Sequence, residues 1–215
     1  MEQEGQILDC RLSLPSNIFL ISKSNAGKTS LLKVIHKKRH EIFKEPITRT
    51  IFVYDGPMGQ FEEFIRENPE VEFAKEIPQI PHDSTDKILL LIDDEMQRLS
   101  GQNNKLLNEI VTKFTHHVYK GATIISQQTL YPKNFSVATS QANVFILFPN
   151  RRNWRSIEYL NSQVFPEQKH FLRSCLLDVA QTPYGFLVVD VENLENGGVR
   201  NFLWDKLDSK VYSPS

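Results

Sequence analysis

Runs of apolar, largely β-branched residues recur along the chain, and polar or amphipathic segments separate them. Runs that are apolar throughout, rather than at alternate positions, indicate strands buried on both faces of a sheet. We therefore expect strands at residues 17–21, 50–54, 71–74, 87–92, 122–126, 143–148 and 185–191.

The segments between these runs carry apolar residues at helical spacing. They predict helices at residues 28–38, 59–67, 104–119, 153–163 and 167–179. Strands that alternate with helices predict a doubly wound, mainly parallel α/β sheet. The last run is followed by a turn at Asn196, Gly197 and Gly198 and by an apolar segment at 199–204, which together predict a β-hairpin at the edge of the sheet.

A candidate phosphate-binding loop follows the first predicted strand. It reads SKSNAGKT, which matches GxxxxGK(S/T) except that Ser22 replaces the first glycine. Backbone N–H groups in such a loop cradle phosphates, the lysine reaches the β- and γ-phosphates, and the hydroxyl holds Mg²⁺. We expect Ser22 to strain the tight turn, and a chance glycine–serine turn is the alternative interpretation. The predicted nucleotide contacts are Ser22, Lys23, Ser24, Asn25, Ala26, Gly27, Lys28, Thr29 and Ser30.

A second motif, KILLLIDDE at residues 87–95, places acids directly after a buried strand. The carboxyl ends of strands are where open α/β sheets bind ligands. Asp93 is predicted to hold Mg²⁺ together with Thr29. Asp94 is predicted to orient and activate the attacking water, and Glu95 is the alternative base. The competing interpretation is that the acids only cap a helix N-terminus, which also favours carboxylates.

A third motif, GATIISQQ at residues 121–128, is another buried run that ends in two glutamines. If this strand lies between the strands of the first two motifs, Gln127 at its tip can contact the γ-phosphate or the attacking water. The alternative is that Gln127 and Gln128 begin a solvated loop. The three motifs in this order imply a P-loop ATPase of the additional-strand type.

Residues 107–132, LNEIVTKFTHHVYKGATIISQQTLYP, resemble the genome-packaging ATPases of polinton-like, adintovirus-like and adenovirus-like DNA viruses. These enzymes belong with the poxvirus-type packaging ATPase and the wider FtsK/HerA group of DNA-pumping motors. The resemblance continues through residues 143–166 and 184–190, and so covers about 15–205 within a single domain at 1–215. Its most specific part is the histidine pair, His116 and His117, with Ser126 and Gln127, whereas Lys113 stands where an arginine is common in these relatives.

This resemblance implies an ATP- and Mg²⁺-dependent motor that moves double-stranded viral DNA into a capsid. It also implies a homo-oligomeric ring, capsid vertex proteins as partners, and a location in the host nucleus, a cytoplasmic virus factory or the virion. Ring motors complete each site with an arginine from the neighbouring subunit. Arg152, within NRRNWR, matches the family-like segment best, ahead of Arg151 and Arg155. A solvated helix start, or a contact of this cluster and Trp154 with DNA phosphates, remains an alternative.

The composition narrows the choice of partners. With 25 Lys and Arg against 26 Asp and Glu, the formal net charge is -1, so any DNA contact must be a local patch.

The two cysteines, Cys10 and Cys175, are expected to be reduced packing residues of an intracellular protein. The longest apolar run, 88–92, is too short to span a bilayer, and the acidic, polar N-terminus is not expected to be a secretory signal.

Two other functions fit the same motifs. A nucleotide or nucleoside kinase also combines a phosphate loop with an α/β sheet, and a non-hydrolysing nucleotide switch or capsid-associated scaffold would tolerate the altered loop.

The HKKRH segment at 36–40 is expected to be a solvated cationic helix end, with a DNA-facing patch as the alternative.

Overall fold

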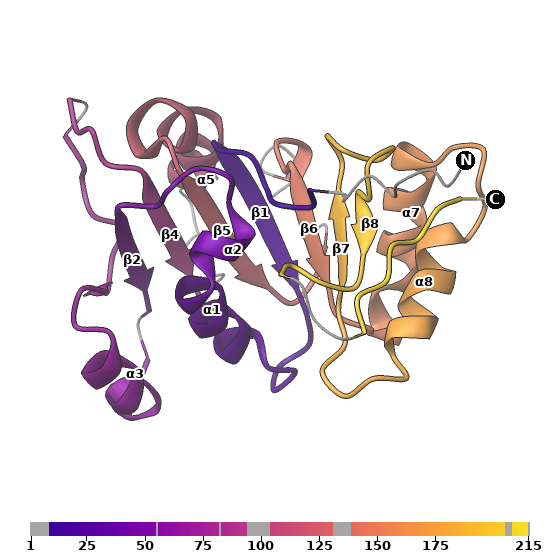
Figure 1. The fold of residues 1–215 in the computed structure, drawn as a ribbon, viewed down its shortest axis with the longest axis horizontal. Coiled ribbons are helices and arrows are strands. Elements are labelled where there is room, and N and C mark those ends of the chain that lie inside the picture. Colours follow the sequence, from indigo (N-terminus) through magenta and orange to yellow (C-terminus); the bar gives the residue numbers. More distant parts are fainter. Residues whose placement is uncertain are drawn as a thin grey trace, which may run out of the picture.

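Eight strands form one mixed sheet in the computed structural model, which describes residues 9–54, 56–81, 83–93, 104–130, 139–204 and 208–214. Their order is β3-β2-β4-β5-β1-β6-β7-β8 (Figure 1). All neighbouring pairs from β3 to β6 are parallel, whereas β7 is antiparallel to β6 and β8 is antiparallel to β7. The strands are β1 (Ser16–Ile21), β2 (Arg49–Val53), β3 (Glu72–Ala74), β4 (Ile88–Ile92), β5 (Ala122–Gln127), β6 (Val144–Leu147), β7 (Leu187–Asp190) and β8 (Val199–Arg200).

The order of the central strands confirms the predicted α/β class and its additional strand. β5 lies between β1, which leads into the candidate phosphate loop, and β4, which leads into Asp93. The three strands run parallel, so their carboxyl ends meet at one edge of the sheet. The three candidate motifs therefore share that edge.

Helices cover both faces of the sheet, as the doubly wound prediction requires. Along β1, Ile18 and Leu20 pack on the face of α1, while Phe19 and Ile21 pack on the opposite face with η2, α7 and α8. No helix within the described ranges is both long and apolar enough to cross a membrane. The helices are α1 (Lys28–Lys37), α2 (Arg39–Ile42), η1 (Met58–Phe61), α3 (Glu62–Glu67), α5 (Asn104–Glu109), η2 (Ile110–Tyr119), η3 (Arg151–Asn153), α7 (Trp154–Val164) and α8 (Phe171–Val179).

The helix predicted at 104–119 changes type midway. α5 is an α-helix, but η2 is a π-helix, which is rare at this length. The Thr115 hydroxyl lies 3.0 Å from the Ile110 carbonyl oxygen, to which it donates, and 2.7 Å from the hydroxyl of Thr123 on β5. These buried contacts fix η2 on the central strand. The helix predicted at 167–179 begins only at Phe171, because His170 has a left-handed φ of 61°.

The predicted C-terminal hairpin is present at the sheet edge, with a second strand shorter than expected. Val189 pairs with Val199, and β8 then ends at Arg200. Arg200 is buried and donates hydrogen bonds to the carbonyl oxygens of Gly197 (2.9 Å) and Cys10 (2.7 Å). Its guanidinium lies 4.0 Å from the Asp190 carboxylate. This buried cation ties the hairpin to the first described residues of the chain.

The HKKRH segment forms the expected cationic helix end, with Lys37 and His40 exposed, but its first residue, His36, departs from the expectation. α1 ends at Lys37, and His36 is fully buried against Phe64, with ring centroids 5.6 Å apart. Its Nδ1 lies 3.0 Å from the Thr50 hydroxyl. Burial, reinforced by the positive charge of Arg39, lowers the pKa of His36, although Glu70 opposes the shift. His36 is therefore a neutral core residue.

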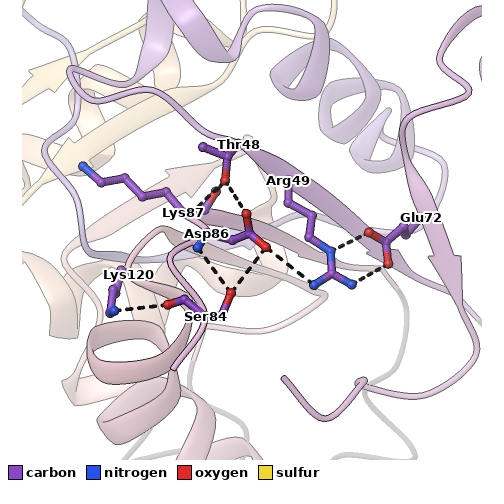
Figure 2. Close-up of polar contacts among 7 residues, drawn as sticks. All are labelled: Thr48, Arg49, Glu72, Ser84, Asp86, Lys87 and Lys120. Atoms are coloured by element: carbon purple, nitrogen blue, oxygen red, sulfur yellow. Dashed lines mark hydrogen bonds and ion pairs between the residues drawn. The ribbon is translucent and has the colours of Figure 1, made fainter. Parts of the chain in front are cut away.

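A polar cluster fastens the loop before β4 to the amino edge of the sheet, away from the three motifs (Figure 2). Arg49, the first residue of β2, binds Glu72 through two nitrogens at 2.5 and 2.7 Å. Asp86 accepts a hydrogen bond from Thr48 at 3.1 Å, and Lys120 donates to the Ser84 carbonyl oxygen at 3.2 Å. These contacts are exposed or partly buried, so their net contribution to stability is small.

Candidate nucleotide-binding site

The segment between β1 and α1 forms a turn whose strain does not fall on Ser22. Within this loop the positive φ values belong to Asn25 (59°) and Gly27 (94°). Asparagine and glycine are the residues that tolerate this conformation best. Ser22 instead continues the strand ladder, donating its N–H to the Gln127 carbonyl oxygen at 3.0 Å, and its hydroxyl donates to the Lys23 carbonyl oxygen at 2.9 Å. The prediction that Ser22 strains the turn is therefore wrong.

The start of α1 carries features that favour an anion. Gly27 is its N-cap, so no side chain caps the helix, and the first turn has no acidic residue. The first N–H groups and the helix dipole thus attract negative charge. Lys28 is buried, with its ammonium 3.4 Å from the Lys23 carbonyl oxygen across the loop. Of the other predicted contacts, Ala26, Gly27 and Thr29 are half-buried, and Lys23, Ser24, Asn25 and Ser30 are exposed.

Thr29 and Asp93 meet directly. The Thr29 hydroxyl donates a hydrogen bond to Asp93 Oδ2. Asp93 follows β4, is 1 % exposed, and donates its backbone N–H to the Val53 carbonyl oxygen at 3.1 Å. A hydroxyl and a carboxylate oxygen are ligands of the kind that Mg²⁺ prefers, so these two residues fit the predicted metal role. Asp94 and Glu95 lie outside the described residues.

The tip of β5 holds polar groups that the described residues leave without partners. Gln127 is fully buried, pairs in register with Ile21, and neither atom of its amide has a hydrogen-bond partner in the described part of the chain. The buried hydroxyl of Ser126 likewise has no hydrogen-bond partner among the described residues. Such groups are rare in native proteins because each costs about 1–3 kcal/mol. They are the groups a bound ligand would satisfy.

Strand alternation separates these two side chains. Leu91 of β4 pairs with Ile124 of β5, and both pack on the α1 face. Continuing the alternation by two residues puts Ser126 beside Asp93 on that face, and Gln127 on the opposite face with Ile125. The sequence analysis gave the sensor role to Gln127 alone. Ser126 emerges as a second candidate only once the register between β4 and β5 is known.

The candidate arginine segment begins at the same edge of the sheet. β6 runs parallel to β1, and the Phe148 N–H donates to the Ile21 carbonyl oxygen at 2.9 Å. Asn150 caps η3 by accepting from the Arg152 N–H at 3.1 Å, and the Asn153 side chain donates to the Gln128 carbonyl oxygen at 3.1 Å. The bond from Asn153 to Gln128 docks η3 onto the end of β5.

The arginine side chains of this segment are solvent-exposed, unlike the neighbouring tryptophan. Arg151, Arg152 and Arg155 are exposed and so are accessible to a second molecule. Trp154 is half-buried, packs against the core, and has the Arg173 guanidinium 5.4 Å from its ring centroid. Trp154 therefore acts as a packing residue, which weakens the alternative in which it interleaves with DNA.

No protein-family model and no curated protein sequence matches this chain significantly. Solved structures do match its fold. The genome packaging NTPase B204 from Sulfolobus turreted icosahedral virus 2 in complex with sulfate aligns with a TM-score of 0.54 at 14% identity, covering 94% of this chain and 98% of that one. The same protein in complex with ATP-gammaS gives the same values.

The DNA-packaging ATPase B204 from Sulfolobus turreted icosahedral virus is also similar in structure. It aligns with a TM-score of 0.51 at 13% identity, with 94% of this chain and 98% of that chain covered. At these identities the likeness establishes a shared fold over nearly the whole of both chains. It leaves the activity of this chain to be inferred from its own site.

Proposed function

We propose that this chain is an ATP-hydrolysing motor that moves double-stranded DNA into a viral capsid. The observation that carries the proposal is the hydrogen bond between Thr29 and Asp93 beside the tip of β5, whose buried polar groups have no hydrogen-bond partner among the described residues. That arrangement suits hydrolysis of a nucleoside triphosphate. The packaging role draws its support from the B204 enzymes, which share the fold and are described as genome-packaging NTPases.

In this proposal, residues Ser22 to Ser30 bind the triphosphate. The N–H groups at the start of α1 bind phosphate oxygens, and Lys28 turns from the Lys23 carbonyl oxygen to the β- and γ-phosphates. Thr29 and Asp93 hold Mg²⁺, directly or through water. The bound ion neutralises charge that develops on the phosphate oxygens.

The attacking water is oriented from the tip of β5 and from the acids after β4. The Gln127 amide can donate to a phosphate oxygen and accept from a water, and the Ser126 hydroxyl can do either. Asp94 is the proposed base, with Glu95 as the alternative. Arg152, exposed on η3, is proposed to reach the γ-phosphate of a neighbouring subunit in a homo-oligomeric ring.

The DNA grip is proposed to use phosphate contacts, since packaging must ignore base sequence. With a net charge of -1, the chain has to concentrate its basic groups on the surface that lines the ring. Binding by phosphate contacts weakens steeply with salt. The capsid vertex is the proposed docking partner, and the infected cell, in its nucleus or a cytoplasmic factory, the proposed site of action.

The test is ATP hydrolysis measured with and without double-stranded DNA, in the wild-type chain and in Lys28→Ala. DNA-stimulated hydrolysis that disappears in the variant is the expected result. Arg49→Ala, at the opposite edge of the sheet, is the matched control and should hydrolyse ATP normally. Transfer of phosphate to a nucleoside monophosphate instead of water would replace the motor with a kinase. Nucleotide binding without any turnover would replace it with a switch.

A further inference from the structure

A large aromatic side chain stands in solvent beside the phosphate loop. Tyr184 is 78% exposed, and it lies in the connection between α8 and β7. A methyl group added to Gly27 would meet Tyr184 Cδ1 at 3.5 Å and Cε1 at 4.0 Å. One edge of the ring therefore touches the loop, and most of the ring remains uncovered.

The topology explains how a residue so far along the chain arrives there. β7 is antiparallel to β6, so its first residue, Leu187, pairs with Leu147, the last residue of β6. β6 in turn ends beside Ile21, immediately before the phosphate loop. The connection into β7 thus passes over the carboxyl edge, where the candidate site lies.

The backbone that carries Tyr184 is held firmly in this position. The Gly185 N–H donates to the Thr182 carbonyl oxygen at 3.0 Å, and a side chain at Gly185 would lie 2.1 Å from the Val179 carbonyl oxygen. Phe186 is buried, with its ring centroid 5.8 Å from that of Phe148. Tyr184 itself takes a left-handed φ of 57°, which is unfavourable for a bulky residue. The ring is therefore pre-positioned at a conformational cost.

We propose that Tyr184 stacks on the base of the nucleoside triphosphate bound at the phosphate loop. The inference rests on the proposed function, because it needs the phosphates to be held between Ser22 and Ser30. An aromatic ring offers a flat apolar face to any base, and a ring that is already placed loses little conformational freedom on binding. Stacking reads the face of a base rather than its edge, so Tyr184 raises affinity with little selection among bases.

The experiment compares binding of Mg·ATP and of inorganic tripolyphosphate by calorimetry. The proteins are the wild type, Tyr184→Ala and Tyr184→Phe, with Tyr159→Ala as a control at another exposed tyrosine. Tyr184→Ala is expected to weaken ATP binding by about 5- to 100-fold. Its tripolyphosphate binding should stay within about twofold of the wild type, since that ligand has no base to stack. Tyr184→Phe and Tyr159→Ala should bind both ligands normally.

The outcomes separate this proposal from the proposed function. Equal weakening of ATP and tripolyphosphate would show that the ring supports the phosphate loop, and would overturn base stacking alone. Unchanged ATP binding in Tyr184→Ala would also overturn base stacking. The exposed ring would then be a contact surface for another subunit. A wild-type chain that binds neither ligand would overturn both proposals. Preserved tripolyphosphate binding also verifies that the variant is folded.

Discussion

The Thr29 hydroxyl donates a hydrogen bond to the Asp93 carboxylate, joining the start of α1 to the end of β4. The contact places two candidate Mg²⁺ ligands together although 64 positions separate them in the sequence. It depends on β1 and β4 ending at the same edge with one strand between them.

Removal of the Thr29 hydroxyl should impair both stability and turnover. Thr29→Val leaves the buried Asp93 carboxylate without this donor, and we expect the free energy of unfolding to fall by about 1–3 kcal/mol. Hydrolysis should fall by about 10²-fold or more, with a higher Mg²⁺ requirement, because the metal loses a ligand. Denaturant unfolding and a Mg²⁺ titration of ATPase activity measure the two effects. Thr29→Ser keeps the hydroxyl and should retain most of the stability and most of the hydrolysis. A loss of hydrolysis in Thr29→Ser equal to that in Thr29→Val would contradict the metal role.

Gln127→Leu should stabilise the protein while it strongly lowers turnover. The buried amide has no partner among the described residues, so a leucine of similar volume removes a desolvation cost of about 1–2 kcal/mol. Turnover should fall by about 10²-fold or more if the amide contacts the γ-phosphate or the water. Thermal unfolding and steady-state hydrolysis are the measurements. Gln128→Leu, at the exposed neighbour, should change neither.

Ser126→Ala tests the other buried polar group of β5. Alternation places Ser126 on the face of Asp93, so its loss should reduce turnover if the site extends along that face. We expect about a 10-fold fall in turnover with little loss of stability, since the hydroxyl also lacks a partner within the described residues. Normal hydrolysis in Ser126→Ala, measured beside Gln127→Leu, would confine the sensor to Gln127.

Rings made only of Arg152→Ala subunits should lose ATP hydrolysis, whereas rings mixed with a complementary variant should not lose it completely. Lys28→Ala subunits retain Arg152 but have a defective loop, whereas Arg152→Ala subunits have the opposite defect. Mixing the two should restore part of the activity, because each pair in the right order contains one complete site. Activity of the mixture is compared with that of each variant alone. An exposed arginine on α3, Arg66, supplies the control variant Arg66→Ala, and no recovery on mixing would exclude a role in trans.

Stability should fall on acidification because of His36. Its pKa is lowered in the folded protein, so the unfolded chain binds a proton more readily below its ordinary pKa of 6.5. The stabilisation is complete above that value and is lost progressively as the pH falls below it. Denaturant unfolding between pH 8 and 5.5 should show this slope. His36→Gln should flatten it, and His40→Gln, at an exposed histidine, should not.

The local pattern of residues was sufficient for the strands β1 to β7 and for the motifs that follow them. Apolar runs identified the strands from β1 to β7, since a parallel sheet needs residues buried on both faces. The spacing of Gly27, Lys28 and Thr29 identified the candidate phosphate loop, because the chemistry of such a loop is contained within a few consecutive residues. Asp93 was found in the same way, as the first acid after a buried strand.

Other features depended on which residues the fold brings together. His36 looked like part of a basic helix end, and only the packing of Phe64 and Thr50 around it makes it a neutral core residue. The prediction of strain at Ser22 was wrong because the positive φ angles of the turn fall at Asn25 and Gly27.

The sequence by itself determined the sheet class, the candidate phosphate loop and the acid of the candidate metal site, because each is encoded by neighbouring residues. Only the tertiary structure decided that Ser126 shares the face of Asp93 and that the ring of Tyr184 lies against Gly27. Both depend on strand register and on an antiparallel return through β7, which are long-range contacts that no local pattern specifies.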